Sequence, residues 1–208
     1  MNLVTILVTR SKSCHVKTLH SVLRLNIRCL QKNINNEIVY VGDDPYEKAD
    51  AVQRYLKSHD RIIFVDFGVG VDEASLDQCF EKHEGVGCLV FPGVKEGIDW
   101  EMFKTKVKDG MNEPTNQMGL HFDTKVDKKV GKDIYNVSET EARAWMMNTK
   151  NVMKVMQKTK DLKVSPKMFE KFSRQGVRIC AFTAAKLTMT YTHECVSNIL
   201  NAAGVKIN

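Results

Sequence analysis

One carboxylate of this chain stands out because of the residues on either side of it. Asp66 follows the apolar run Ile62–Val65 and comes shortly before Gly68 and Gly70. Such a run of large apolar residues is typical of a strand buried on both faces, and glycines after it leave room for a ligand beside the backbone. Open α/β sheets bind their ligands at the carboxyl ends of their strands. We therefore expect Asp66 to lie in a ligand site.

Several familiar catalytic and phosphate-binding motifs are excluded by single residues. A P-loop would need glycine where the chain has Val126 and serine or threonine where it has Asp133. The dinucleotide fingerprint that begins at Gly68 would need a third glycine in place of Glu73. No Gly-x-Ser-x-Gly elbow occurs, and His193-Glu194 lacks the second histidine of a zinc-binding helix.

The elements that must position Asp66 alternate between strand and helix. Strands are predicted over residues 3–9, 37–41, 61–66 and 86–91. Helices are predicted from Thr18, from Asp44 and from near Asp72. The helix at Asp44 has a strong start signal, because the aspartate can cap it and Pro45 and Glu47 follow. This alternation predicts an α/β fold with a mostly parallel central sheet flanked by helices on both faces.

The second half is less regular. Residues 109–137 are polar and lysine-rich, and we expect irregular structure there, interrupted by a strand at 118–122. Ser138–Glu141 resembles a capping box, which predicts a helix carrying Trp145 and Met146. A helix from Ser165 to Gly176, a strand at 177–182 and a helix at 192–203 are predicted to follow.

Composition narrows the class of protein. The chain has 208 residues, a net charge of +6 and six scattered cysteines without a C-x-x-C pair. These features favour one globular domain in a reducing compartment, which we expect to be the cytoplasm. Apolar runs are far shorter than the roughly 20 residues of a membrane span. Aromatic residues do not alternate with the lysines, so nucleic acid is not an expected partner.

The segment 60–71 resembles the strand that leads into the Asp-x-Asp motif of GT-A-fold nucleotide-sugar glycosyltransferases. The resemblance implies a GT-A-like, mixed and mostly parallel sheet, a UDP-sugar donor, a glycan acceptor and Mn²⁺ or Mg²⁺ held by Asp66. By position, Thr9, Arg10 and Asp44 would line the nucleotide, and Arg54 would reach the diphosphate. A hard divalent cation on carboxylate oxygens would stabilise the departing nucleoside diphosphate.

This chain departs from the motif at Gly68, where the family has its second aspartate. Asp72 or His193 would then have to complete the metal shell, unless donor phosphates and water do so. The alternative for Asp66 is a structural carboxylate that caps a turn or pairs with Arg10 or Arg61.

In segments that include residues 91–100 and 191–195, the chain also resembles the N-terminal domain of chlorovirus-encoded glycosyltransferases that build capsid glycans. This similarity implies transfer of a hexose or deoxyhexose, of glucose or rhamnose type, with retention of configuration, and the host cytoplasm as its location. We expect one domain over 1–208, with a nucleotide-binding half at 1–92 and an acceptor-side half at 93–208. No catalytic residue can be named; Glu96, Asp99 and Asp123 are candidate carboxylates. A nucleotidyltransferase and a non-catalytic nucleotide- or glycan-binding module remain open alternatives.

Overall fold

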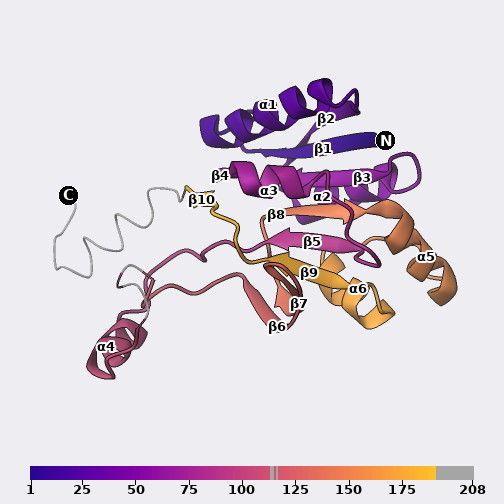
Figure 1. The fold of residues 1–208 in the computed structure, drawn as a ribbon. Coiled ribbons are helices and arrows are strands. Elements are labelled where there is room, and N and C mark those ends of the chain that lie inside the picture. Colours follow the sequence, from indigo (N-terminus) through magenta and orange to yellow (C-terminus); the bar gives the residue numbers. More distant parts are fainter. Residues whose placement is uncertain (113–114, 116, 191–208) are drawn as a thin grey trace.

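An eight-stranded sheet with the strand order β2-β1-β3-β8-β5-β9-β7-β6 forms the centre of the molecule (Figure 1). The computed structural model describes residues 1–112, 115 and 117–190. The strands of this sheet are β1 (Asn2–Thr9), β2 (Asn35–Gly42), β3 (Arg61–Val65), β5 (Cys88–Phe91), β6 (Thr124–Gly131), β7 (Ile134–Thr140), β8 (Ala144–Asn148) and β9 (Ile179–Phe182). Two short strands, β4 (Val69–Gly70) and β10 (Thr188–Met189), form a separate antiparallel pair.

The sheet is mixed, and most of its strands run in one direction. β1 is parallel to β2 and β3, and β5 is parallel to β9. β8 lies between β3 and β5 and is antiparallel to both, so β5 runs the same way as β3. β7 is antiparallel to β9 and to β6. Only β7 and β8 therefore oppose the other strands of this sheet, and the predicted fold class is confirmed.

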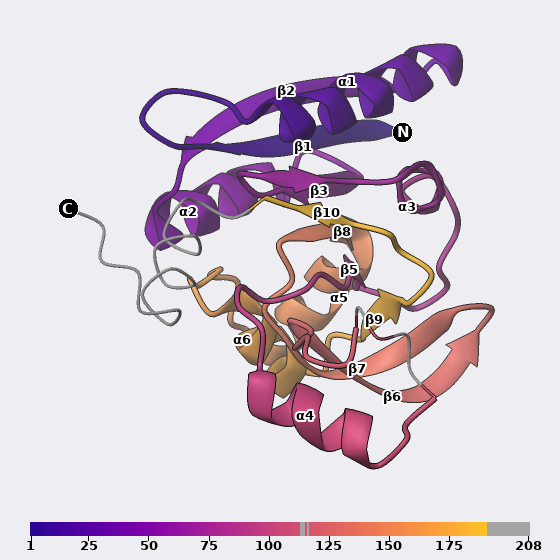
Figure 2. The same cartoon turned by 90° about the vertical axis from the view of Figure 1, so that its left-hand side faces the viewer.

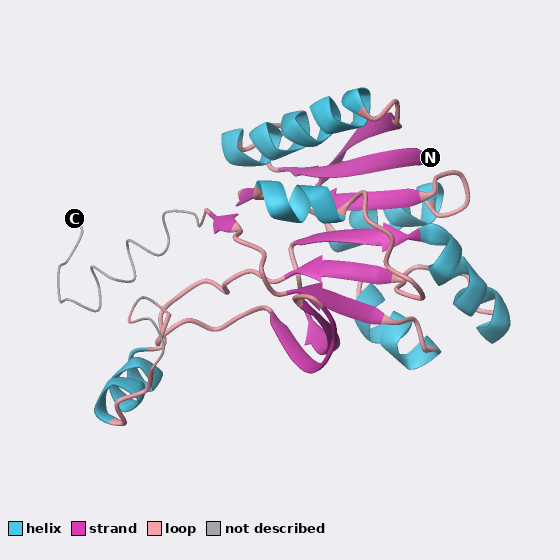
Figure 3. Cartoon of the chain, in the orientation of Figure 1, coloured by secondary structure: helices cyan, strands magenta, loops and turns pink. Residues whose placement is uncertain are grey.

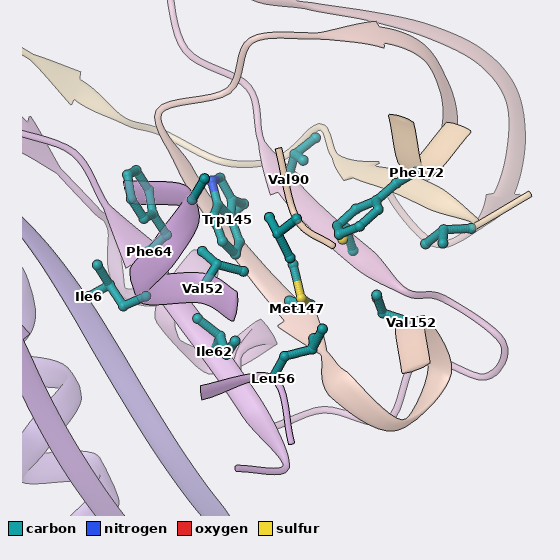
Figure 4. Close-up of a cluster of buried hydrophobic side chains, with 14 of the residues drawn as sticks. Ile6, Val52, Leu56, Ile62, Phe64, Val90, Trp145, Met147, Val152 and Phe172 are labelled. Carbon is teal, nitrogen blue, oxygen red and sulfur yellow. The ribbon is translucent and has the colours of Figure 1, made fainter. Parts of the chain in front are cut away.

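Helices cover both faces of the sheet (Figures 1 and 3). α1 (Val16–Gln31) and α3 (Glu73–Gln78) bury Leu25 and Leu76 on one face. α2 (Pro45–Tyr55), α5 (Thr149–Thr159) and α6 (Met168–Gln175) cover the other face. Figure 4 shows the core on that side, where Val52 of α2 and Phe172 of α6 pack against strand residues such as Trp145.

The start of α2 follows the sequence signal. The Asp44 carboxylate accepts hydrogen bonds from the backbone N–H groups of Tyr46 and Glu47, both at 2.9 Å. The Glu47 carboxylate accepts from the N–H of Gly42 at 3.0 Å and not from that of the cap residue. The helix therefore begins where predicted, and it is also tied back to the end of β2.

Two predictions for the second half are wrong. Residues 118–122 form no strand, and Phe122 makes only an isolated bridge with Val94. The lysine-rich stretch after them instead contains the β6–β7 hairpin. The segment with Trp145 and Met146 is strand β8 and not a helix, and α5 begins only at Thr149. The predicted helix at 192–203 lies outside the described residues.

The nine-residue helix α4 (Trp100–Lys108) lies away from the sheet at the end of two long connections (Figures 1 and 2). Its N-terminal cap is Asp99, whose carboxylate accepts from the N–H of Met102 at 2.8 Å and contacts His121 at 3.0 Å. None of its residues is buried. No helix among the described residues is long and apolar enough to cross a membrane.

Candidate functional site

The carboxyl ends of β1, β2 and β3 lie at one edge of the sheet because these strands are neighbours and parallel. Thr9, Asp43 and Asp66 are the residues at or just after those ends. β8 runs in the opposite direction, so Arg143, which precedes it, lies at the same edge. The backbone N–H of Asp66 donates to the Arg143 carbonyl at 2.9 Å and joins the two segments.

The Asp66 side chain is held by two cations. Its Oδ2 accepts from Arg143 Nε at 2.9 Å, and its Oδ1 lies 3.5 Å from Lys48 Nζ. Oδ1 also accepts from the N–H of Phe67 at 2.9 Å. The Asp66 side chain is only 13% exposed. Arg143 donates a further hydrogen bond to the Phe67 carbonyl at 2.5 Å, which fixes the guanidinium beside the strand end.

These contacts belong to a longer chain of alternating charges. Lys48 also pairs with Asp43, and Asp43 Oδ2 accepts from Arg10 Nε at 2.6 Å. We call the series Arg10–Asp43–Lys48–Asp66–Arg143 the ion-pair chain. Burial by itself would raise the pKa of Asp43, but hydrogen bonds from Lys48 and Arg10 outweigh it and hold the pKa below its ordinary value.

Arg10 is positioned by a tight turn. Ser11 and Lys12 have φ angles of 47° and 59°, and Arg10 and Ser13 exchange backbone hydrogen bonds of 3.1 and 2.8 Å. Two consecutive residues with positive φ are typical of a two-residue type I′ turn. The Arg10 guanidinium lies 5.1 Å from the centre of the Phe67 ring. The first strand end is thereby attached to the segment after Asp66.

The other predicted nucleotide ligands have different surroundings. The Thr9 hydroxyl donates to the Val41 carbonyl at 3.0 Å, between the ends of β1 and β2. Asp44 is the N-cap of α2. Arg54 lies in the last turn of α2, at the end of the helix opposite Asp44, and is exposed. The structure thus brings Thr9, Arg10, Asp44 and Asp66 to one edge and does not bring Arg54 there.

Sequence reasoning did not identify Arg143 or Lys48 as site residues. It considered Arg10 or Arg61 as a partner for Asp66, but Arg61 is buried and donates to the Cys79 carbonyl and, at 2.6 Å, to the Glu81 carbonyl. Lys48 could have been found, because it follows the capped start of α2 by one helical turn. Arg143 gave no local signal, since its position depends on β8 being a strand.

A pocket of about 380 Å³ lies beside the ion-pair chain, between α2, α6 and the β3–β8 pair. Its lining includes Asp66, Lys48 and Arg143, together with the aromatic side chains of Phe64 and Trp145. An adjoining pocket of about 510 Å³ shares part of its lining, including Glu141, and extends toward Asp123 and the β6–β7 hairpin. The pocket beside Asp66 therefore adjoins the second pocket, which is lined by Asp123.

Asp123 is a buried carboxylate in that second pocket, 7% exposed. Its Oδ1 accepts from the N–H of Gly93 at 3.0 Å and from the Thr124 hydroxyl at 2.8 Å. Its Oδ2 is buried and has no hydrogen-bond partner within the described part of the chain. Burial raises the pKa of Asp123 above its ordinary value. A buried carboxylate that lines a pocket and has an unpaired oxygen is a candidate functional group.

The described residues do not fit a resident divalent cation. Among them, no group of three or more His, Cys, Asp or Glu side chains could hold a metal ion. Asp72 accepts instead from the Ser75 hydroxyl at 2.5 Å and from the N–H of Lys186 at 3.1 Å, and His193 lies outside the described residues. A cation on Asp66 would also meet Lys48 and Arg143, and like unit charges about 4 Å apart repel by on the order of 4 kcal/mol at an effective dielectric constant of about 20.

Comparison with known proteins gives similarities of overall fold only. No family model matches the chain, and no curated protein does. A solved structure of GalNAc-T7 with UDP, GalNAc and Mn²⁺ is similar at 11% identity and a TM-score of 0.48, over 96% of this chain and 47% of that one. The chain therefore spans about half the length of that protein.

Two further solved structures are similar to this chain. An inositol-1-phosphate CTP transferase from T. maritima has 11% identity and a TM-score of 0.43, over 97% of this chain and 76% of that one. The galactosyltransferase LgtC, in complex with donor and acceptor sugar analogs, has 8% identity and a TM-score of 0.39, over 87% of this chain and 73% of that one. All three TM-scores are below 0.5.

Proposed function

We propose that this chain is a glycosyltransferase that moves a hexose or deoxyhexose from a UDP-sugar to a glycan acceptor. The observation that carries the proposal is the ion-pair chain at the carboxyl edge of the sheet, beside a pocket that continues toward Asp123. A departing nucleoside diphosphate develops concentrated negative charge. Fixed cations at the position of that charge stabilise it in the transition state.

The two halves of the sequence take different main roles in this proposal. Thr9, Arg10 and Asp44 in residues 1–92 line the nucleotide, and residues 93–208 bind the acceptor. Asp123 contacts the acceptor hydroxyl, because its Oδ2 is buried beside the second pocket without another partner in the described residues. The predicted role of Asp66 as a ligand of Mn²⁺ or Mg²⁺ has no support in the ligand set above, and no step of the proposal uses a metal.

The resemblance to chlorovirus-encoded enzymes extends the proposal to a glucose- or rhamnose-type sugar, transferred with retention of configuration during capsid glycan synthesis. Retention is tested by NMR of the anomeric proton in the first product that forms. The configuration at that carbon equals that of the donor if the enzyme retains, and is opposite if it inverts.

A donor screen tests the proposed reaction. UDP release should be measured for UDP-glucose, UDP-rhamnose and UDP-GlcNAc, with CDP-glucose and GDP-mannose as base controls. We expect release from a UDP-hexose or UDP-deoxyhexose, and a decrease of at least tenfold in the Arg10→Gln variant. Lys150→Gln is the matched control, because Lys150 pairs with Asp60 at the opposite edge of the sheet. No release from any donor would overturn the proposal.

A non-catalytic nucleotide-binding module is the second candidate. The observation in its favour is that both oxygens of Asp66 already have partners within the protein. Calorimetry with UDP separates the two candidates: binding of UDP without turnover of any donor or transfer to any glycan would favour the module.

A further inference from the structure

The ion-pair chain has a cation at each end and one in the middle. Arg10, Lys48 and Arg143 carry three positive charges, and Asp43 and Asp66 carry two negative ones, so the group has a net charge of +1. Its members come from the ends of β1, β2 and β3, from α2 and from the residue before β8. They therefore surround the strand end from several sides.

Two of these cations keep hydrogen-bond donors for a ligand. Lys48 has three N–H donors and Arg143 has five, and both line the 380 Å³ pocket. The contacts that Arg143 makes to Asp66 and to the Phe67 carbonyl use its Nε and one of its two terminal nitrogens. Asp66 and Asp43 orient the cations, because each carboxylate bridges two of them.

A diphosphate is the ligand chemistry that suits this arrangement. Guanidinium groups bind phosphate oxygens in two-pronged fashion, and a lysine ammonium binds them as a point charge. The same arrangement disfavours a divalent metal ion on Asp66, because Lys48 and Arg143 already contact its carboxylate.

We propose that Lys48 and Arg143 hold the diphosphate of the nucleotide directly, so that this chain binds nucleoside diphosphates without a divalent cation. Asp66 is then a positioning residue that orients the two cations, and not a metal ligand. This inference rests on the proposed function for the identity of the nucleotide, but the diphosphate site can be tested by itself.

Calorimetry with inorganic pyrophosphate and with UDP tests the inference, each in EDTA and each with Mn²⁺. We expect both ligands to bind in EDTA. Lys48→Gln and Arg143→Gln should each weaken this binding by about tenfold or more, since each removes a charged hydrogen bond. Lys150→Gln should leave it unchanged. Circular dichroism and thermal unfolding of each variant separate loss of the site from loss of the fold.

Asp66→Asn gives the sharpest contrast. If Asp66 is a positioning residue, Asp66→Asn raises the net charge of the ion-pair chain to +2 but loosens the orientation of Lys48 and Arg143, so binding in EDTA should persist within about threefold of that of the native protein. If Asp66 holds a metal, the same variant abolishes a binding that requires Mn²⁺. Binding only with Mn²⁺, or loss of binding in Asp66→Asn, would overturn the inference.

The failure of this inference is distinct from failure of the proposed function. If pyrophosphate binds in EDTA and UDP binds no more tightly than CDP or GDP, the diphosphate site is supported and the UDP-sugar transferase is contradicted. If UDP binds only in the presence of Mn²⁺, the metal-free diphosphate site is contradicted and the UDP-sugar transferase is supported. Absence of binding for both ligands would overturn both proposals.

Discussion

Asp123 shows how a single residue relates stability to function in this molecule. Its carboxylate is buried, and one oxygen has no hydrogen-bond partner in the described part of the chain. Burial raises the pKa of Asp123 above that of an exposed aspartate. The ordinary pKa of an aspartate, which applies in the unfolded chain, is 3.8. Below that pH the protonated Asp123 contributes its full stabilisation to the fold. This stabilisation is lost as the pH rises through the higher pKa of the folded state.

Asp123→Asn should therefore make the protein more stable at neutral pH. We expect an increase of about 1 kcal/mol in the free energy of unfolding at pH 7, because the uncharged amide costs less to bury than a carboxylate with an unpaired oxygen. The difference from the native protein should shrink as the pH falls toward 4.

Urea denaturation at pH 7 and pH 4.5 measures this difference, and donor and acceptor assays on the same variant measure transfer. Under the proposed function, glycosyl transfer falls while stability rises. A variant that is less stable than the native protein at pH 7, or a difference that does not change with pH, would contradict this account of Asp123.

At the scale of one element, α1 shows that apolar periodicity predicts a helix but not which of its apolar residues are buried. The apolar spacing from Leu19 to Leu30 predicts a helix, and a helix is present. The residues that face the sheet include Val22, Leu25 and Cys29, whereas Leu23 and Ile27 are 49% and 54% exposed. The helix has two apolar stripes, and its packing on β1 and β4 decides which of them is buried.

Leu25→Ala should destabilise the protein by about 2–5 kcal/mol, because it leaves a cavity against the sheet. Ile27→Ala is the matched control on the same helix and should change the free energy of unfolding by less than about 0.5 kcal/mol. Urea denaturation of both variants measures the contrast. Equal losses would mean that the exposed stripe is covered in solution.

At the scale of the whole molecule, β8 joins the two halves of the sequence. β8 inserts between β3 and β5, and β5 in turn pairs with β9, so strands of residues 1–92 and 93–208 alternate across the sheet. Trp145 of β8 stacks on Phe64 of β3 with ring centres 4.9 Å apart and planes at 3° (Figure 4). Phe169 of α6 lies nearly perpendicular to the same indole, with ring centres 5.8 Å apart and planes at 84°.

Trp145→Ala should lower the free energy of unfolding by about 3–5 kcal/mol. Because one core crosses both halves, fluorescence of the buried Trp145 and circular dichroism should report a single unfolding transition in the native protein. Two separate transitions there would show that the halves fold independently.

The first half of the fold could be predicted because its signals are local. Caps such as Asp44, and apolar runs of strand length such as Ile62–Val65, determine helix starts and buried strands through interactions within a few residues. Asp66 was recognised for the same reason, since its place at a strand end follows from its neighbours. The candidate nucleotide residues Thr9 and Asp44 reached the predicted edge because parallel neighbouring strands end together.

What the tertiary structure decided depends on contacts distant in sequence. The run around Trp145 has residues that suit either a helix or a strand, and only its place between β3 and β5 makes it a strand. That placement brings Arg143 to Asp66, 77 residues away along the chain. The sequence by itself identified the carboxylate and the edge of the sheet where it lies. Only the folded chain shows which cations surround Asp66, because electrostatic partners are selected by distance in space.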